Sequence, residues 1–144
     1  MREFQDLPKF DAQGFRRSVE QRERRLRPGS LGRFEWLMYR GSETRALGWV
    51  SLRMQERDPE SGEVGYSVIE SERNQGFASE AVRAIIAEGF SAARLARIRA
   101  FCIPENVPSR VVLEKIGFTQ KATLPHGAMV HGKPVDVLAF VLER

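Results

Sequence analysis

The sequence predicts a mixed α/β fold, with one mostly antiparallel sheet and flanking helices. Short apolar stretches with polar residues between them recur along the chain, turn-forming segments separate them, and two stretches have the three- and four-residue spacing of amphipathic helices. A strand, a helix and a strand in succession imply a parallel strand pair with a right-handed crossover. The length of 144 residues, 42% of them hydrophobic, suits a single domain covering 1–144.

The first half of the chain is expected to contain one helix and three strands. Residues 16–26 have helical spacing, and Pro28 ends that helix. Strands are expected at 34–39 and 46–54, joined in a hairpin by the turn-like segment RGSETR. A second turn, RDPESGE, is expected before a strand at 64–69.

The second half begins with the segment RNQGFASEA, which should open a helix. A strand is expected at 97–103, followed by the helix VPSRVVLEKI with Gly117 as its C-cap. The last two strands, at about 119–129 and 135–142, should pair across HGKP. The apolar face of the first of these helices consists of Ala78, Ala81, Val82, Ile85, Ile86 and Phe90.

Composition argues against several classes of protein. The start MREFQDLPKF has no apolar run of signal-peptide type and no stretch has 18 apolar residues in succession, so a cytoplasmic protein without membrane contact is expected. One cysteine and two widely spaced histidines make no metal-site pattern, so no metal is expected.

The formal charge of +4 comes from the N-terminal region, where residues 1–40 hold ten Lys and Arg against six Asp and Glu. Its densest part, RRSVEQRERRLR at 16–27, would suit nucleic acid as a partner. Glutamates at helical spacing from the arginines favour a solvated helix face with ion pairs instead.

The segment RNQGFASEA also has features of an anion site. The start of a helix presents backbone N–H groups and a partial positive charge, and Gly76 would allow a ligand to approach the backbone closely. Arg73 would add a full charge, and Ala78 almost no bulk. The chain has neither of the two familiar phosphate-loop motifs, so spacing alone favours an ordinary glycine near a helix start.

Three longer motifs, in this order, resemble the GNAT superfamily of N-acetyltransferases: GEVGYSVIESERNQGFASEAV, PENVPSRVVLEKIGF and HGKPVDVLAFVLER. More narrowly, they are similar to its RimJ/RimL-type branch, which acetylates protein N-termini and other amines. The resemblance covers roughly residues 46–144. It implies a sheet in which the parallel strands splay apart, and acetyl-CoA as the co-substrate.

The resemblance implies that the coenzyme pyrophosphate would bind the loop at 73–79 and that pantetheine would lie along the strand before it. The amide of Asn106 would hold pantetheine, Ser109 would lie near the thioester sulfur, and Lys115 would reach a phosphate or remain solvated. Capping of the second helix is the alternative role of Asn106. The implied cofactor-binding residues are Val68, Ile69, Arg73, Asn74, Gln75, Gly76, Phe77, Ala78, Ser79, Asn106, Ser109 and Lys115.

The resemblance also implies direct attack of an amine on the acetyl thioester. Glu63, at the expected head of the coenzyme strand, is the candidate base, with an exposed turn residue as the alternative. Asn106 and Ser109 would position the thioester and ease departure of the thiolate. Many family members have a tyrosine where this chain has Leu113, and leucine cannot donate a proton. A backbone N–H near Val68 would meet the oxyanion.

The histidines His126 and His131 are alternative bases in the terminal hairpin, although each is better explained as a polar loop residue. The N-terminal strand and helix region that frames the acceptor in this family is expected to be short. The acceptor is expected to be a protein N-terminal α-amine or a small-molecule amine, and the protein a monomer or homodimer. Two alternatives remain, a non-catalytic acyl-CoA-binding module and a ribosome- or RNA-associated protein; the latter ranks lowest because its basic segment lacks interleaved aromatic residues.

Overall fold

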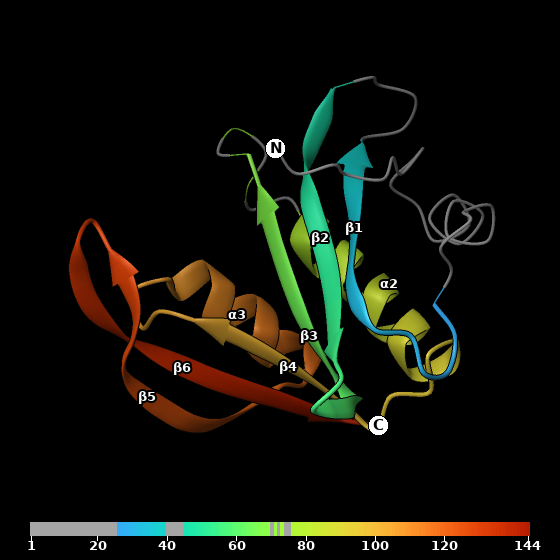
Figure 1. Ribbon diagram of the computed structural model, residues 1–144. Coiled ribbons are helices and arrows are strands. Elements are labelled where there is room, and N and C mark those ends of the chain that lie inside the picture. The colour runs from blue at the N-terminus through green and yellow to red at the C-terminus, as the bar shows by residue number, and fades with distance from the viewer. Residues whose placement is uncertain (1–25, 40–44, 70, 72, 74–75) are drawn as a thin grey trace.

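The structure is a computed structural model, and it describes residues 26–39, 45–69, 71, 73 and 76–144. The expected helix at 16–26 and most of the basic segment at 16–27 lie outside the described residues. The described part contains six strands and two helices, which confirms the mixed α/β class (Figure 1). The elements are β1 Gly32–Tyr39, β2 Ala46–Gln55, β3 Asp58–Val68, α2 Phe77–Ser91, β4 Arg97–Cys102, α3 Val107–Ile116, β5 Thr119–Val130 and β6 Lys133–Glu143.

The six strands form one sheet in the order β1-β2-β3-β4-β6-β5, and β3 with β4 is the parallel pair that was expected. Their pairing is short, because only Ser61–Glu63 lie in register with Arg97–Arg99. Beyond these residues the two strands point in different directions, as Figure 1 shows. The sheet therefore opens into a V, with β1, β2 and β3 in one arm and β4, β6 and β5 in the other.

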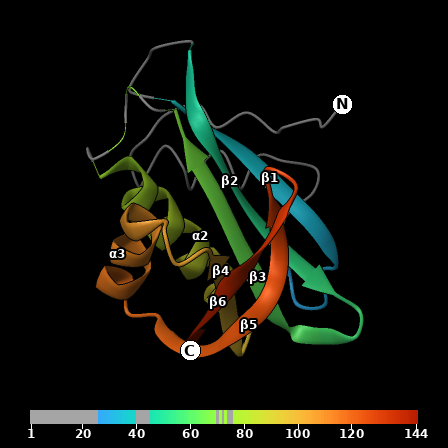
Figure 2. The ribbon, with the colours of Figure 1, turned by 90° about the vertical axis from the view of Figure 1, so that its left-hand side faces the viewer.

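Both helices cover the same face of the sheet (Figure 2). Helix α2 packs its predicted apolar face on the arm that contains β2 and β3, and α3 inserts the fully buried side chain of Leu113. Burial of this apolar surface supplies the main stabilisation of the fold. The most deeply buried large side chains are Trp36, Met38, Leu47, Val50, Leu52, Met54, Ile85, Leu95, Ile98, Leu113 and Phe140.

The turn expected from RDPESGE is mostly strand, so that prediction was wrong. Gln55 pairs with Asp58, which leaves only Glu56 and Arg57 in the turn. Turn-forming residue types misled the prediction, because a proline in the first residues of a strand costs little. As a result Glu63 lies in the middle of β3 and not at its head.

The terminal hairpin follows the sequence prediction more closely. Val130 pairs with Lys133 across His131 and Gly132, whose φ angles of 51° and 77° are the left-handed values of a tight two-residue hairpin turn. Gly117 caps α3 as expected, with a φ of 120° that favours glycine and an N–H that bonds back into the helix.

Candidate functional site

The backbone of β3 faces an open gap where the sheet splays. Ile69 N donates to Leu47 O of β2 at 2.7 Å, and Ala96 N donates to Glu60 O on the opposite edge at 2.8 Å. Because successive residues of a strand direct their peptide groups to alternate edges, the even-numbered residues of β3 face the β4 side. Beyond Glu63, β4 is no longer in register with that edge.

The part of this edge beyond the β3–β4 register includes the N–H and C=O groups of Tyr66 and Val68. The carbonyl of Val68 accepts a hydrogen bond of 3.0 Å from Nε of Arg73, whose side chain thus folds back on the strand. The remaining peptide groups suit an extended ligand that adds to the strand through main-chain hydrogen bonds. The expected contribution of Val68 to the site is compatible with this orientation, and Ile69 faces β2 instead.

Helix α2 begins at the end of β3, next to this edge. Gly76 is its N-cap residue and has a φ of 83°, and no side chain makes a capping hydrogen bond there. The bond from Glu80 N to Gly76 O, 3.0 Å long, is the first helical bond of the described residues. A Cβ at Gly76 would meet no atom within 4 Å, so the start of the helix is open to a ligand. Asn74 and Gln75 lie outside the described residues.

The start of α3 lies on the β4 side of the gap. Oδ1 of Asn106 accepts from Ser109 N at 3.2 Å, and Pro108 lies in the first turn, so Asn106 does cap the helix. Capping uses only the oxygen of the amide, and Nδ2 has no hydrogen-bond partner among the residues that the structure describes. Asn106 is exposed, so its NH₂ group is available to a ligand.

Tyr66 connects the two arms of the V; it lies within the first family motif, but the sequence analysis gave it no role. Its hydroxyl lies 2.7 Å from Oγ of Ser109 and 3.4 Å from the Ser109 carbonyl oxygen. Burial raises the pKa of the Tyr66 phenol, although the hydrogen bond with Ser109 opposes the shift. The contact brings β3 and α3 together across 43 residues of sequence.

Cys102 lies at the end of β4, close to the same serine. Burial raises the pKa of the Cys102 thiol above its usual value, against the lowering effect of the Arg110 charge and of a hydrogen bond with Ser109. The Ser109 hydroxyl thus contacts the Tyr66 phenol directly and also influences the pKa of the Cys102 thiol.

Glu63 is separated from this group. Its carboxylate accepts from Nη2 of Arg53 at 2.8 Å, and its side chain is 38% exposed. Tyr66 faces α3, so Glu63, three residues earlier, faces the opposite side of the sheet, about 10 Å away along the strand. The gap begins beside Glu63, because its pair with Arg99 is the last one of the β3–β4 register.

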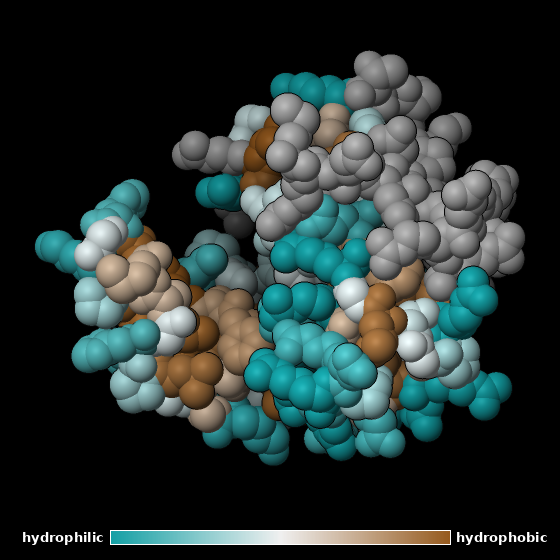
Figure 3. All heavy atoms as spheres, in the orientation of Figure 1, coloured by the Kyte–Doolittle hydropathy of each residue, from teal (hydrophilic) through white to brown (hydrophobic). Residues whose placement is uncertain are grey.

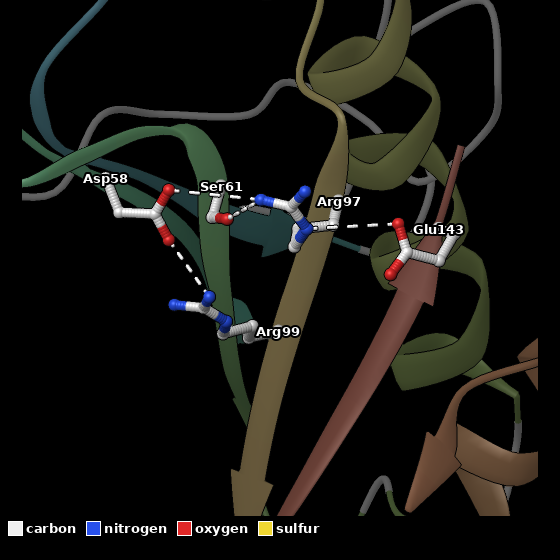
Figure 4. Close-up of polar contacts among 5 residues, drawn as sticks. All are labelled: Asp58, Ser61, Arg97, Arg99 and Glu143. Carbon is white, nitrogen blue, oxygen red and sulfur yellow. Dashed lines mark hydrogen bonds and ion pairs between the residues drawn. The ribbon is translucent and has the colours of Figure 1, made fainter. Parts of the chain in front are cut away.

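Charged residues close the narrow end of the V on this same face (Figure 4). Arg97 contacts Ser61 at 3.1 Å, Asp58 at 3.9 Å and Glu143 at 3.8 Å, and Arg99 pairs with Asp58 at 3.0 Å. Together they connect β3, β4 and β6. Such partly exposed pairs contribute little stability each, so their main effect is on the arrangement of the strands.

The remaining sequence candidates lie further from the gap. Lys115 is exposed in the last turn of α3, at the opposite end of the helix from Asn106. His126 and His131 are exposed in the terminal hairpin, where the backbone N–H of His126 donates to Asp136 at 3.2 Å. Leu113 is buried in the core, so its position does not face the gap.

The surface is hollowed between the two arms (Figure 3). Apolar side chains are exposed mainly on the arm with β4, α3 and β5, which carries Phe101, Val107, Val111, Leu124 and Met129. Within the described ranges no three His, Cys, Asp or Glu side chains gather as a metal site would require. None of the described helices is long and apolar enough to cross a membrane.

The family model of the GNAT acetyltransferase domain matches residues 2–119. The chain belongs to this family. The match includes the N-terminal region, where the motifs in the sequence gave little resemblance. N-acetyltransferase p20 of Bacillus licheniformis, described as uncharacterized, is 32% identical over 79% of the chain and 63% of its own length. YnaD of Bacillus subtilis, also described as an uncharacterized N-acetyltransferase, is 42% identical over 67% of the chain and 49% of its own length.

Solved structures agree with the family assignment. RimJ of Mycobacterium smegmatis, in complex with a coenzyme A disulfide, is 30% identical with a TM-score of 0.65 over 69% of the chain and 48% of its own length. The ribosomal-protein-S5-alanine acetyltransferase of Vibrio fischeri is 28% identical with a TM-score of 0.66 over 69% of the chain and 55% of its own length. The GNAT chain thus spans about half to two thirds of the length of these relatives, and the RimJ/RimL-type resemblance is confirmed.

Proposed function

We propose that the protein is an N-acetyltransferase that moves the acetyl group of acetyl-CoA to a primary amine. The observation that carries the proposal is the splayed parallel pair, which leaves the edge of β3 open between two helix starts. Relatives of this family have been solved with coenzyme A bound, including RimJ. The GNAT family assignment supplies the reaction class, and the gap supplies a site of suitable shape.

The residues around the gap fit the parts of acetyl-CoA. The open start of α2 at Gly76 suits the pyrophosphate, because helix N-termini favour anions and a glycine there leaves room. Arg73 brings a positive charge to that rim. The edge of β3 suits the amides of pantetheine, and Nδ2 of Asn106 can donate to one of its carbonyl groups. Bound acetyl-CoA would supply the acyl thioester.

The chemical roles follow from position. An N–H on the gap side of β3, such as that of Val68, would donate to the carbonyl oxygen as it gains charge. Ser109 would donate a hydrogen bond to the departing sulfur. Glu63 would accept a proton from the amine, directly or through water, from the open face of the sheet. Its carboxylate also pairs with Nη2 of Arg53 at 2.8 Å, so an approaching amine would meet it beside that guanidinium.

The acceptor class that we propose is the α-amine of a protein N-terminus, with small-molecule amines as the second candidate. The similarity to RimJ and to the S5-alanine acetyltransferase supports the first. The α-amine has a pKa near 8 and needs little help to lose its proton at neutral pH. An amine of the lysine type, with a pKa near 10.4, would need more help.

The test is an acetyl-CoA turnover assay on the full chain, with released thiol measured and acetylated product identified by mass spectrometry. Peptides with free α-amines, the same peptides with blocked α-amines and a single lysine, and small amines form the acceptor panel. Turnover with the free α-amines supports the proposal. Tight coenzyme binding without turnover on any acceptor would favour an acyl-CoA-binding module and overturn it.

A further inference from the structure

We propose that Tyr66 is a positioning residue of the acyl-transfer site, whose phenol orients the Ser109 hydroxyl so that the serine proton points into the gap, toward the sulfur that departs. The inference rests on the proposed function. It assigns a role to a side chain that had none in the sequence analysis, and it explains how a site without a tyrosine in α3 can assist the leaving group.

The direction of the hydrogen bond follows from its neighbours. Tyr66 Oη lies 2.7 Å from Ser109 Oγ and 3.4 Å from the Ser109 carbonyl oxygen, which can only accept. A phenol is also a much stronger acid than an aliphatic alcohol, so it is the better donor of the pair. Burial raises the pKa of Tyr66, so the phenol keeps its proton throughout the neutral range. Tyr66 therefore donates and Ser109 Oγ accepts.

When Ser109 Oγ accepts from the phenol, its own proton must point elsewhere. Ser109 lies in the first turn of α3, beside the gap in which the proposed function places the thioester sulfur, so its proton is free to point there.

Such a donor is needed when the carbon–sulfur bond breaks. The amine nitrogen supplies the electron pair of the new C–N bond, and the pair of the C–S bond stays on sulfur as a thiolate. One amine proton goes to solvent or to Glu63, and the thiolate later takes up one from solvent. Ser109 keeps its proton throughout and stabilises the sulfur by a hydrogen bond. Leu113, fully buried, cannot contribute.

The experiment compares Tyr66→Phe, Ser109→Ala and the double variant with the wild type in single-turnover acetyl transfer. Tyr66→Phe keeps the aromatic ring and removes only the hydroxyl. We expect its rate constant to fall about tenfold while the Kd for acetyl-CoA changes less than twofold, because orientation acts on the chemical step. The double variant should be no slower than Ser109→Ala, since both act through one hydroxyl. Tyr39→Phe, which changes the other tyrosine of the chain, is the control and should match the wild type.

A second measurement needs no turnover. Coenzyme A binding is followed by calorimetry in two buffers of different ionisation enthalpy, which gives the number of protons released. A serine proton aimed at the thiol sulfur favours its thiolate, so the wild type should release more protons than Tyr66→Phe or Ser109→Ala. Ser109→Ala leaves the phenol in place and gives this result even if Tyr66→Phe does not fold.

Three results would overturn the inference. These are a Tyr66→Phe variant that equals the wild type in rate and in proton release, additive losses in the double variant, and equal proton release by Ser109→Ala and the wild type. Failure of the proposed function looks different, because the wild type itself would then bind no coenzyme A or acetylate no amine, and the inference would fall with it.

Discussion

The most direct perturbation of the donor site is a charge at the start of α2. Gly76→Asp places a carboxylate where the pyrophosphate is proposed to bind, and Gly76→Asn places a side chain of the same size without the charge. Both side chains have room, since nothing lies within 4 Å of the Cβ position. Both also meet the same φ of 83°, which costs about 1 kcal/mol outside glycine and which Asn and Asp tolerate best.

The expected difference between the two variants is electrostatic. For a carboxylate about 5 Å from a pyrophosphate with two negative charges, in an effective dielectric of about 40, Coulomb's law gives about 3 kcal/mol. That corresponds to a roughly 100-fold weaker affinity for coenzyme A with Gly76→Asp. Gly76→Asn should lose less than about tenfold. The difference in coenzyme A affinity between the two variants should become smaller at high salt.

Isothermal titration calorimetry with coenzyme A and with acetylpantetheine, which lacks the pyrophosphate, separates the causes. Gly76→Asp should lower the affinity for coenzyme A and leave the affinity for acetylpantetheine unchanged. Equal weakening by Asp and Asn would mean that backbone strain is responsible, and unchanged affinity in both would refute the phosphate role of this loop. Thermal unfolding of both variants checks that the fold persists.

Three further predictions concern single side chains. Glu63→Gln should lower kcat/KM about 10²-fold near neutral pH, with partial recovery at high pH where more of the amine is neutral. A pH–rate series identical to that of the wild type would exclude a role of Glu63 as base. The control is Glu143→Gln, which removes a carboxylate at the closed end of the same face. Asn106→Ala should cost about 1 kcal/mol of stability and weaken acetyl-CoA binding, whereas Asn106→Asp should keep the helix cap and still lose binding. Thermal unfolding measures the stability of each variant and calorimetry its affinity for acetyl-CoA. If Asn106→Asp still binds acetyl-CoA, the residue serves only as a cap. Cys102, the single cysteine, should react with a disulfide reagent more slowly than free cysteine at pH 7, because its raised pKa leaves less thiolate at any given pH. Below that pKa, the reaction rate should rise about tenfold for each unit by which the pH increases. A rate that does not change with pH would contradict the direction of the pKa shift.

Much of the fold could be predicted from the sequence, because many of its features depend only on residues that are close together in the chain. The helix face from Ala81 to Ile86, the cap at Gly117 and the two-residue turn at His131 each depend on neighbouring residues only. The start of β3 was not readable, since Asp58 and Pro59 are turn formers that here begin a strand. Local residue types cannot report that a neighbouring strand pairs with them.

In the candidate site too, features that local motifs mark could be predicted, and features that depend on distant contacts could not. The helix start at Gly76 and the cap at Asn106 could be predicted because motifs mark both positions. The pair of Glu63 with Arg53 was not, because a register shift between Met54 and Gln55 changes which residues face each other. Tyr66 and Ser109 meet only because the chain folds back over 43 residues. Tyr66 lies on the helix face of β3 in the structure, and nothing in the sequence names its partner.

The edge of β3, where acetyl-CoA is proposed to bind, and the face around Glu63, where the amine is proposed to approach, present different chemical groups. The edge of β3 in the gap consists of peptide groups, and its side chains project to either side of the sheet. Most substitutions along β3 that preserve the strand would therefore leave the coenzyme contacts of that edge unchanged. The opposite face, with Glu63, Arg53 and Arg99, consists of side chains that single mutations can replace. A scaffold divided in this way can acquire a new acceptor by point mutation while it keeps its donor, which makes this open face the place to begin when engineering the protein for a different amine.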